Sequence, residues 1–193
     1  MLPETEQTMP ATDEELYRAY LAGDEAGLRQ LIERYGDSLT LYLNGYIHDL
    51  GDAEDLMVEA FARTARAKPN LTGNTFRAYL YKTGRNLALR FYAKQMRSQE
   101  FGFEDLEQEP DSGALLETTV TTRERHRILH LCMEKLDPTL REALWLVYFE
   151  GMSYAESARV MNKRPKQLDH LLQKGKKLLR EALEKEGVTD AEY

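Results

Sequence analysis

Apolar residues at helical spacing constrain the fold of this chain more than any other feature of its sequence. From Leu28 to Ile47, and again from Leu168 to Ala182, apolar side chains recur every three or four residues, which places them on one face of a helix. Five shorter segments have similar spacing: 12–21, 52–65, 76–91, 138–150 and 153–161. The sequence therefore predicts an all-α fold.

Capping residues predict where several of these helices begin. Thr12 and Ser153 each precede a glutamate by three residues, which is the spacing of a capping box. Asp24, Asp52 and Asp137 are further candidate N-caps, because an aspartate carboxylate accepts hydrogen bonds from the free N–H groups of a first helical turn. These residues divide the periodic segments into separate helices of ordinary length.

The carboxy-terminal segment has the order of elements of a helix-turn-helix. A helix that follows Asp137 is expected to stop near Gly151, a short helix covers 153–161, and a basic helix opens at Pro165. In DNA-binding proteins of this type, the last helix lies in the major groove. DNA is therefore a candidate ligand of this segment.

Charge is strongly segregated along the chain, although the formal net charge is only -7. Residues 62–97 contain nine bases and no acid, and residues 158–180 contain eight bases against the single acid Asp169. Between these two basic segments, residues 98–122 contain seven acids and no base. Basic segments of this kind are typical of nucleic-acid-binding surfaces, which the overall charge conceals here.

Residues 98–122 have no sustained periodicity and contain a proline and two glycines, which is typical of an extended linker. Phe101, Phe103 and Leu106 are its candidate docking residues. We therefore expect two small helical domains, at 1–97 and 123–193, joined by an acidic flexible linker.

Several other classes of protein are disfavoured. No apolar run approaches the ~20 residues of a membrane span, so no membrane insertion is expected. The acidic amino terminus is unlike a signal peptide, and we expect a cytoplasmic protein. Cys132 is the only cysteine, which leaves no internal disulfide. Because no phosphate-binding glycine loop, nucleophile motif or cofactor fingerprint is present, we expect no catalytic residue, no cofactor and no enzymatic activity.

Three segments, in this order, resemble the extracytoplasmic-function (ECF) group of bacterial RNA polymerase sigma factors. They are GDAEDLMVEAF at 51–61, FRAYLYKTGRNLALRFYAKQMR at 76–97 and LDPTLREALWLVYFEGMSYAESARVMN at 136–162. The resemblance implies a four-helix domain of the sigma region 2 type and a helix-turn-helix domain of the region 4 type. It also implies three partners, which are core RNA polymerase, promoter DNA and an anti-sigma factor.

The resemblance assigns the first domain to core polymerase and to the minus-ten promoter element. The 51–61 segment implies docking on the β′ clamp, through Asp52, Glu54, Asp55, Leu56 and Glu59. The 76–97 segment and the loop before it imply binding and opening of the minus-ten element, through Lys68, Asn70, Asn74, Arg77, Tyr81, Lys82, Arg85 and Tyr92. Within that set, the asparagines would hold a flipped base and the two tyrosines would stack on unpaired bases if their rings are exposed.

The resemblance assigns the second domain to the minus-35 element and to the β flap of the polymerase. The candidate DNA contacts lie in and before the last helix: Lys163, Arg164, Lys166, Gln167, His170, Lys174 and Lys177. Gln167 and His170 lie opposite the leucine stripe, where side chains reach base edges. The cations are better suited to phosphate contacts, which position a protein without reading sequence.

Two alternatives to a sigma factor stay open at this point. Val58 occupies a position where the family often has Gln, and the last helix departs from the family pattern, which would fit a DNA-binding regulator that has lost polymerase docking. A helical protein whose basic faces bind acidic proteins is the second alternative.

His126 and His130 share a helix face but turn away from Cys132, so no metal site is predicted.

Overall fold

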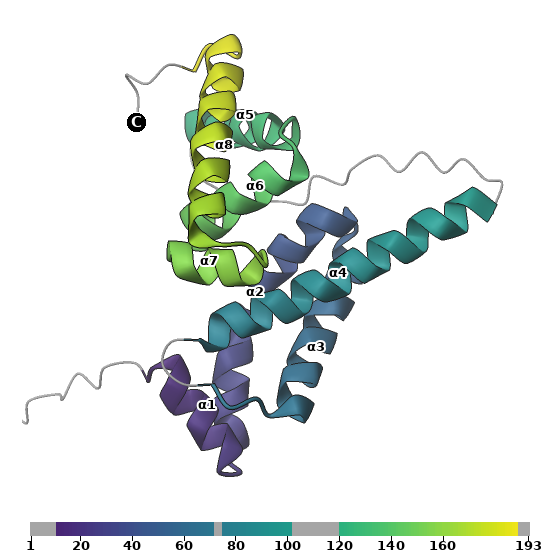
Figure 1. Cartoon of the computed structure of the whole chain (residues 1–193), viewed down its shortest axis with the longest axis vertical. Helices are drawn as coiled ribbons and strands as arrows, with labels where there is room; N and C mark the ends of the chain where they lie inside the picture. The colour runs from purple at the N-terminus through teal and green to yellow at the C-terminus, as the bar shows by residue number, and fades with distance from the viewer. Residues whose placement is uncertain (1–10, 72–74, 102–119, 189–193) are drawn as a thin grey trace, which may run out of the picture. The chain divides into compact units, whose positions relative to one another are not determined.

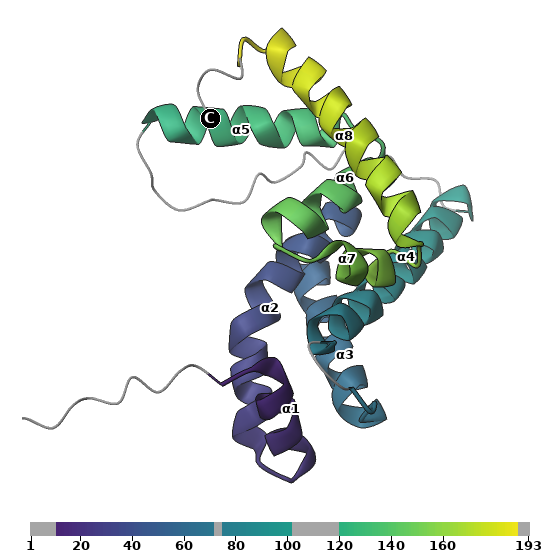
Figure 2. The same ribbon diagram turned by 60° about the vertical axis from the view of Figure 1, so that its left-hand side comes forward.

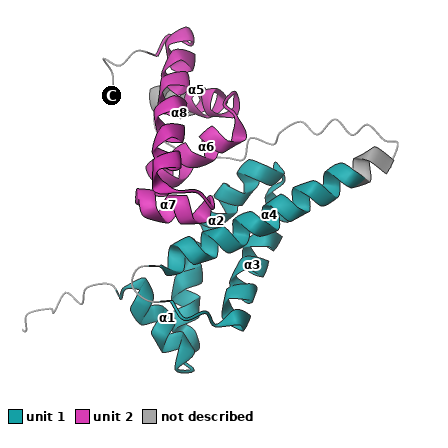
Figure 3. Cartoon of the chain, in the orientation of Figure 1, with its two compact units in different colours: residues 1–102 teal, residues 103–193 magenta. Residues whose placement is uncertain are grey.

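The computed structural model describes residues 11–71, 75–101 and 120–188, and within these ranges every regular element is a helix. The chain forms two compact units, Met1–Gly102 and Phe103–Tyr193, referred to below as unit 1 and unit 2 (Figure 3). The prediction of an all-α fold with two helical domains is confirmed. None of the described helices is both long enough and apolar enough to cross a membrane.

Unit 1 is built around one long helix. Its elements are α1 (Asp13–Leu21), α2 (Glu25–Ile47), α3 (Leu50–Ala67) and α4 (Phe76–Phe101) (Figure 1). Helix α2 packs against the other three, and α1 runs antiparallel to its first half (Figure 2). The side chains at the centre of this core are buried: Leu31, Leu39, Leu43, Phe61, Phe76, Leu80 and Tyr81.

The predicted caps of the first two helices are present, and that of the third is not. Thr12 forms both halves of a capping box with Glu15, and Asp24 accepts a hydrogen bond from the Ala26 backbone N–H. Helix α3 is capped by Asp49, three residues before the predicted cap Asp52. The reason is that α2 ends in a left-handed residue at position 48, after which Asp49 is extended and α3 begins at Leu50.

Helical spacing in 76–91 predicts a buried stripe that includes Tyr79 and Thr83, but the buried face of α4 differs from it. Both are only half-buried, whereas Tyr81, Gly84 and Ala88 are buried. Because α4 packs on both α2 and α3, the face that it buries is wide and is rotated away from the predicted stripe. A Cβ atom on Gly84 would lie 3.2 Å from a methyl group of Leu39, so the absent side chain allows the close approach of α2.

Unit 2 consists of α5 (Val120–Glu134), α6 (Pro138–Leu144), the π-helical turn η1 (Trp145–Phe149), α7 (Tyr154–Val160) and α8 (Pro165–Lys185). Helix α8 packs on α5, α6 and α7. The predicted caps Asp137 and Ser153 are confirmed, and Pro165 is the first residue of α8. The helix expected over 138–150 is interrupted by η1, whose wider turn inserts one residue into the helical register.

Most of the predicted linker at 98–122 lies outside the described residues, including Phe103 and Leu106. Its two ends are helical, since α4 continues to Phe101 and α5 begins at Val120. Both helices therefore extend beyond the domain boundaries expected from the sequence.

Candidate nucleic-acid and protein interfaces

Helix α3 carries an acidic face with an apolar centre, which we call the α3 face: Asp52, Glu54, Asp55, Leu56, Val58 and Glu59. Glu54 and Asp55 are exposed, and Val58, which lies one turn from both, is 60 % exposed. Partial burial raises the pKa of Asp52, and the neighbouring carboxylates of Asp49 and Asp55 raise it further. Positive charge on a partner would relieve this repulsion, so the face is suited to a basic protein surface.

The clamp residues predicted on α3 therefore share one helix but not one environment. Leu56 and Asp52 are half-buried, and Glu59 accepts a hydrogen bond from Arg63 at 2.7 Å. Among the described residues, no group of three His, Cys, Asp or Glu side chains could hold a metal ion.

The cationic surface of unit 1 begins where α3 ends. Lys68 is exposed and terminates α3 in the left-handed conformation, at φ 43°, and Asn70 in the following loop is exposed as well. Asn74 lies outside the described residues. On α4, Arg77, Lys82 and Arg85 are half-buried.

An exposed apolar stripe follows these cations along α4. Tyr92 is 44 % exposed, and Leu89 and Met96 are 40 % and 41 % exposed on the same side of the helix. The spacing of these three residues, by three and by four positions, is visible in the sequence and is the signal that would have predicted this stripe. We call Leu89, Tyr92 and Met96 the α4 stripe. Its aromatic ring among cations is suited to an unpaired base and its phosphates.

The prediction that Tyr81 stacks on a base is wrong. Its side chain is fully buried, its hydroxyl group lies 2.8 Å from the Ser38 Oγ, and its ring packs against Tyr42. The larger apolar residues, such as Phe76, Leu80 and Leu87, predict a narrow buried stripe that leaves position 81 on the outer face. The small residues Gly84 and Ala88 extend the buried face around to Tyr81.

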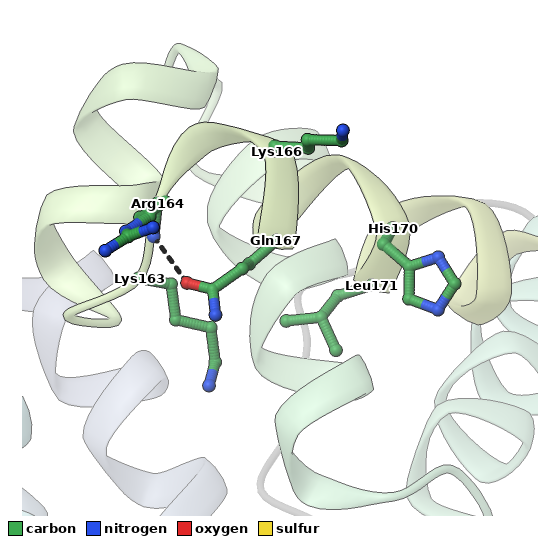
Figure 4. Close-up of a pocket in the computed structure, with 6 residues that line it drawn as sticks. All are labelled: Lys163, Arg164, Lys166, Gln167, His170 and Leu171. Atoms are coloured by element: carbon green, nitrogen blue, oxygen red, sulfur yellow. Dashed lines mark hydrogen bonds between the residues drawn. The ribbon is translucent and has the colours of Figure 1, made fainter.

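The start of α8 forms a cationic depression of about 550 Å³, lined by Lys163, Arg164, Lys166, Gln167, His170 and Leu171 (Figure 4). Arg164, Lys166 and His170 are exposed, as are Lys174 and Lys177 further along the helix. The opposite face of α8 buries Leu168 and Leu172 in unit 2. The structure thus brings all seven predicted minus-35 residues to the side of α8, or the turn before it, that faces solvent.

Gln167 has a second role that the sequence did not indicate. Its Oε1 atom accepts a hydrogen bond from the Arg164 backbone N–H at 2.9 Å, which caps the first turn of α8 (Figure 4). The amide NH₂ stays available as a donor to a base edge. Asp169 Oδ2 accepts a hydrogen bond from Gln173 Nε2 at 3.0 Å, so one oxygen of this carboxylate is already bound within the helix.

A second exposed surface in unit 2 was missed in the sequence. Tyr148 and Phe149 are 54 % and 51 % exposed, and Trp145 stacks on Phe149 with ring centroids 4.7 Å apart. The indole N–H of Trp145 donates to Glu150 Oε1, which fixes the stack. All six residues at 144–149 are apolar or aromatic, which is more than one buried helix face can hold. This excess is the signal in the sequence that would have predicted an exposed apolar surface here. We call Trp145, Tyr148 and Phe149 the η1 patch.

Comparison with known proteins gives two matches to family models. Residues 31–98 match sigma-70 region 2, and residues 126–179 match sigma-70 region 4. The ECF RNA polymerase sigma-E factor of Escherichia coli K12 is 28 % identical over 160 residues, which cover 78 % of this chain and 83 % of that protein. The RNA polymerase sigma-H factor of Pseudomonas aeruginosa PAO1 is 28 % identical over 158 residues, 77 % of this chain and 82 % of that protein.

Two solved structures have the same fold. CnrH, in complex with the cytosolic domain of CnrY, has a TM-score of 0.65 at 21 % identity and covers 89 % of this chain and 97 % of its own. The sigma factor RpoE from Bartonella quintana, in complex with the anti-sigma factor NepR, has a TM-score of 0.59 at 18 % identity, over 81 % of this chain and 96 % of its own.

Proposed function

The chain belongs to the sigma-70 family, in its ECF group, and from this we propose that its two units divide the work of promoter recognition. As a sigma factor it acts in the initiation of transcription. Unit 1 docks on the polymerase clamp and opens the minus-ten element, and unit 2 binds the minus-35 element. The protein contributes specificity and no catalytic group of its own.

One observation carries this division of work: each unit has its own cationic surface, and the two differ in kind. On α4 the cations accompany an exposed tyrosine, which suits unpaired bases. On α8 they flank Gln167 and His170 on a helix without exposed aromatic residues, which suits a duplex groove. Run-off transcription with core polymerase on genomic fragments tests the proposal as a whole.

The protein docks on core polymerase through two further surfaces in this proposal. The α3 face binds the β′ clamp, and the η1 patch, with its fixed pair of rings, binds the β flap. Burying two exposed aromatic side chains supplies the apolar area that a small interface needs. The alternative of a DNA-binding regulator without polymerase docking predicts no co-elution with core polymerase.

The proposed partners include an anti-sigma factor, because the similar sigma factor RpoE from Bartonella quintana was solved in complex with the anti-sigma factor NepR. We propose the domain limits 1–97 and 123–193 with the acidic segment 98–122 between them, and a cytoplasmic location. Free protein would be held inactive by the anti-sigma factor and released to bind the core.

Reversal of one charge on the α3 face is expected to weaken core binding. Asp55→Lys should lower the affinity for core polymerase by about tenfold, since it replaces attraction to a basic clamp surface by repulsion. Fluorescence anisotropy of labelled protein titrated with core measures this. Glu184→Lys, an equal change of charge at an exposed position near the end of α8, is the control. Equal affinities of wild type and Asp55→Lys would contradict the assignment.

Two changes on α8 are expected to affect DNA in different ways. Lys177→Gln should weaken binding to every duplex and reduce the slope of log K against log salt by about 0.9, the value for one phosphate contact. Gln167→Glu keeps the oxygen that caps α8 but removes the amide donor, so it should change which minus-35 sequence is preferred, by ~1 to 3 kcal/mol at one base pair. Binding of a randomised duplex library, sequenced before and after selection, distinguishes the two. Identical sequence profiles for both variants would show that Gln167 reads no base.

A further inference from the structure

The residues that directly follow α3, at 68–71 and called the loop after α3 below, lack a backbone hydrogen bond that a continued helix would supply. In an α-helix, the carbonyl group of Ala65 would accept from the N–H of residue 69. That residue is Pro69, which has no N–H. Lys68, which precedes it, donates to the Thr64 carbonyl at 3.1 Å and has a left-handed conformation that a lysine rarely adopts. Other contacts must therefore fix the start of this loop.

Two tyrosines of α1 provide those contacts. The Tyr20 hydroxyl donates to the Ala65 carbonyl at 3.1 Å, in place of the missing N–H of Pro69. The Tyr17 hydroxyl donates to the carbonyl of Pro69 itself at 2.9 Å. The Lys68 ammonium lies 5.8 Å from the centre of the Tyr20 ring, within the range of a cation–π contact.

Tyr17 also contacts the start of α4. Its ring, which is 3 % exposed, packs against Phe76 at a centroid distance of 5.2 Å, and Phe76 is the first residue of α4. One side chain thus contacts Pro69, two residues after the end of α3, and the residue that starts α4. Burial raises the pKa of Tyr17, with smaller contributions from Tyr79 and Tyr20, so its hydroxyl group keeps the proton that it donates.

Helix α1 is itself held rigidly on α2. Asp13 is buried, pairs with Arg34 and accepts a hydrogen bond from the Tyr35 hydroxyl. Close packing at Gly27 brings the backbones of the two helices together. Yet α1 precedes residue 31, at which the match to sigma-70 region 2 begins. The anchor of the loop therefore comes from outside the matched segment.

We propose that Tyr17 and Tyr20 are positioning residues that set the sequence selectivity of the loop after α3 for unpaired promoter bases. This rests on the proposed function of Lys68 and Asn70 as minus-ten contacts. A base-edge hydrogen bond discriminates between bases only if its donor is fixed, whereas a phosphate contact tolerates movement of a flexible lysine. Loosening the loop should therefore reduce selectivity and leave general affinity for single strands nearly unchanged.

The test removes only the two hydroxyl groups, with Tyr17→Phe, Tyr20→Phe and the double variant in full-length protein bound to bacterial core polymerase. The probe is the single-stranded 12-mer that the wild-type holoenzyme enriches most from a randomised pool, compared with the same bases scrambled. Removal of either hydroxyl group should reduce the preference for the enriched strand roughly 2- to 10-fold, which is the usual contribution of one hydrogen bond. In the double variant, the ratio of the Kd for the scrambled strand to the Kd for the enriched strand should fall about 10-fold. Its Kd for the scrambled strand should change less than 2-fold.

Tyr81→Phe is the matched control, because it removes a buried hydroxyl group of the same unit, one that contacts Ser38 of α2. Hydrogen exchange should be faster in peptides covering 64–71 for the double variant only. A preference that survives in the double variant, or an equal loss for both strands, overturns the proposal. A wild-type holoenzyme that enriches no sequence overturns the proposed function of the loop, and this proposal with it.

Discussion

Holoenzyme that carries Asn70→Ala and Tyr92→Ala is expected to transcribe from a closed duplex promoter on the order of 100-fold less than wild type. Stacking of a base on an aromatic ring contributes ~1 to 3 kcal/mol, and a base-edge contact contributes ~1 to 3 kcal/mol. Both contacts exist only after a base has left the duplex, so their loss raises the free energy of the open complex and leaves the docking of the α3 face intact. The exposure of Asn70 and Tyr92 makes both available for these contacts.

The measurement compares the closed promoter with the same promoter whose minus-ten region is mismatched and already open. On the open template the cost of unpairing has been removed, so the defect should be partly rescued. Arg90→Ala is the control, because Arg90 is exposed on the same helix but lies away from the α4 stripe. Equal defects on both templates would exclude a role in opening. No defect on either would mean that the α4 stripe is an ordinary solvated surface.

Gly27→Ala is expected to destabilise unit 1 by roughly 2 to 3 kcal/mol, although the same change usually stabilises a helix by up to ~1 kcal/mol. A Cβ atom at this position would lie 2.2 Å from the backbone oxygen of Leu16 and 3.1 Å from the backbone nitrogen of Tyr20. Backbone atoms cannot move aside as the end of a flexible side chain can, so α1 has to shift away from α2. Its anchoring tyrosines would shift with it.

Thermal unfolding followed by circular dichroism should show the transition of unit 1 lowered by about 10 °C for Gly27→Ala. Gly45→Ala is the matched control, since Gly45 is exposed on the same helix and a Cβ atom there would meet nothing within 4 Å. That variant should be slightly more stable than wild type. Trp145, the only tryptophan, lies in unit 2, so its fluorescence should report an unchanged transition for both variants. A Gly27→Ala protein as stable as Gly45→Ala would contradict the close packing of α1 on α2.

Much of the architecture could be predicted because it is encoded within one or two helical turns. Thr12 and Ser153 form capping boxes, and Asp137 caps α6, because the groups they bind lie two or three residues away. The segregation of charge, which led to two nucleic-acid surfaces, is likewise a property of short segments. The residues of α8 that face solvent could be predicted because the leucines opposite them repeat regularly.

Predictions failed where two local solutions were equivalent or where small residues carried the signal. Asp49 and Asp52 are both good caps, and only the end of α2 at position 48 decides between them. The apolar pattern predicts that Tyr81 lies on the outer face of α4, because Gly84 and Ala88 contribute little to that pattern. They are nevertheless the positions at which another helix can approach closely.

By itself, the sequence determined that this chain is all-α, where most of its helices begin, and that two basic segments are separated by an acidic one. Only the tertiary structure decided which face of α4 is buried, and that Tyr17 and Tyr20 hold the loop after α3. The hydrogen bonds of those tyrosines join residues 52 and 45 positions apart. Helical periodicity specifies neighbours three and four residues apart, whereas contacts of such long range exist only once α1, α3 and α4 have packed around α2.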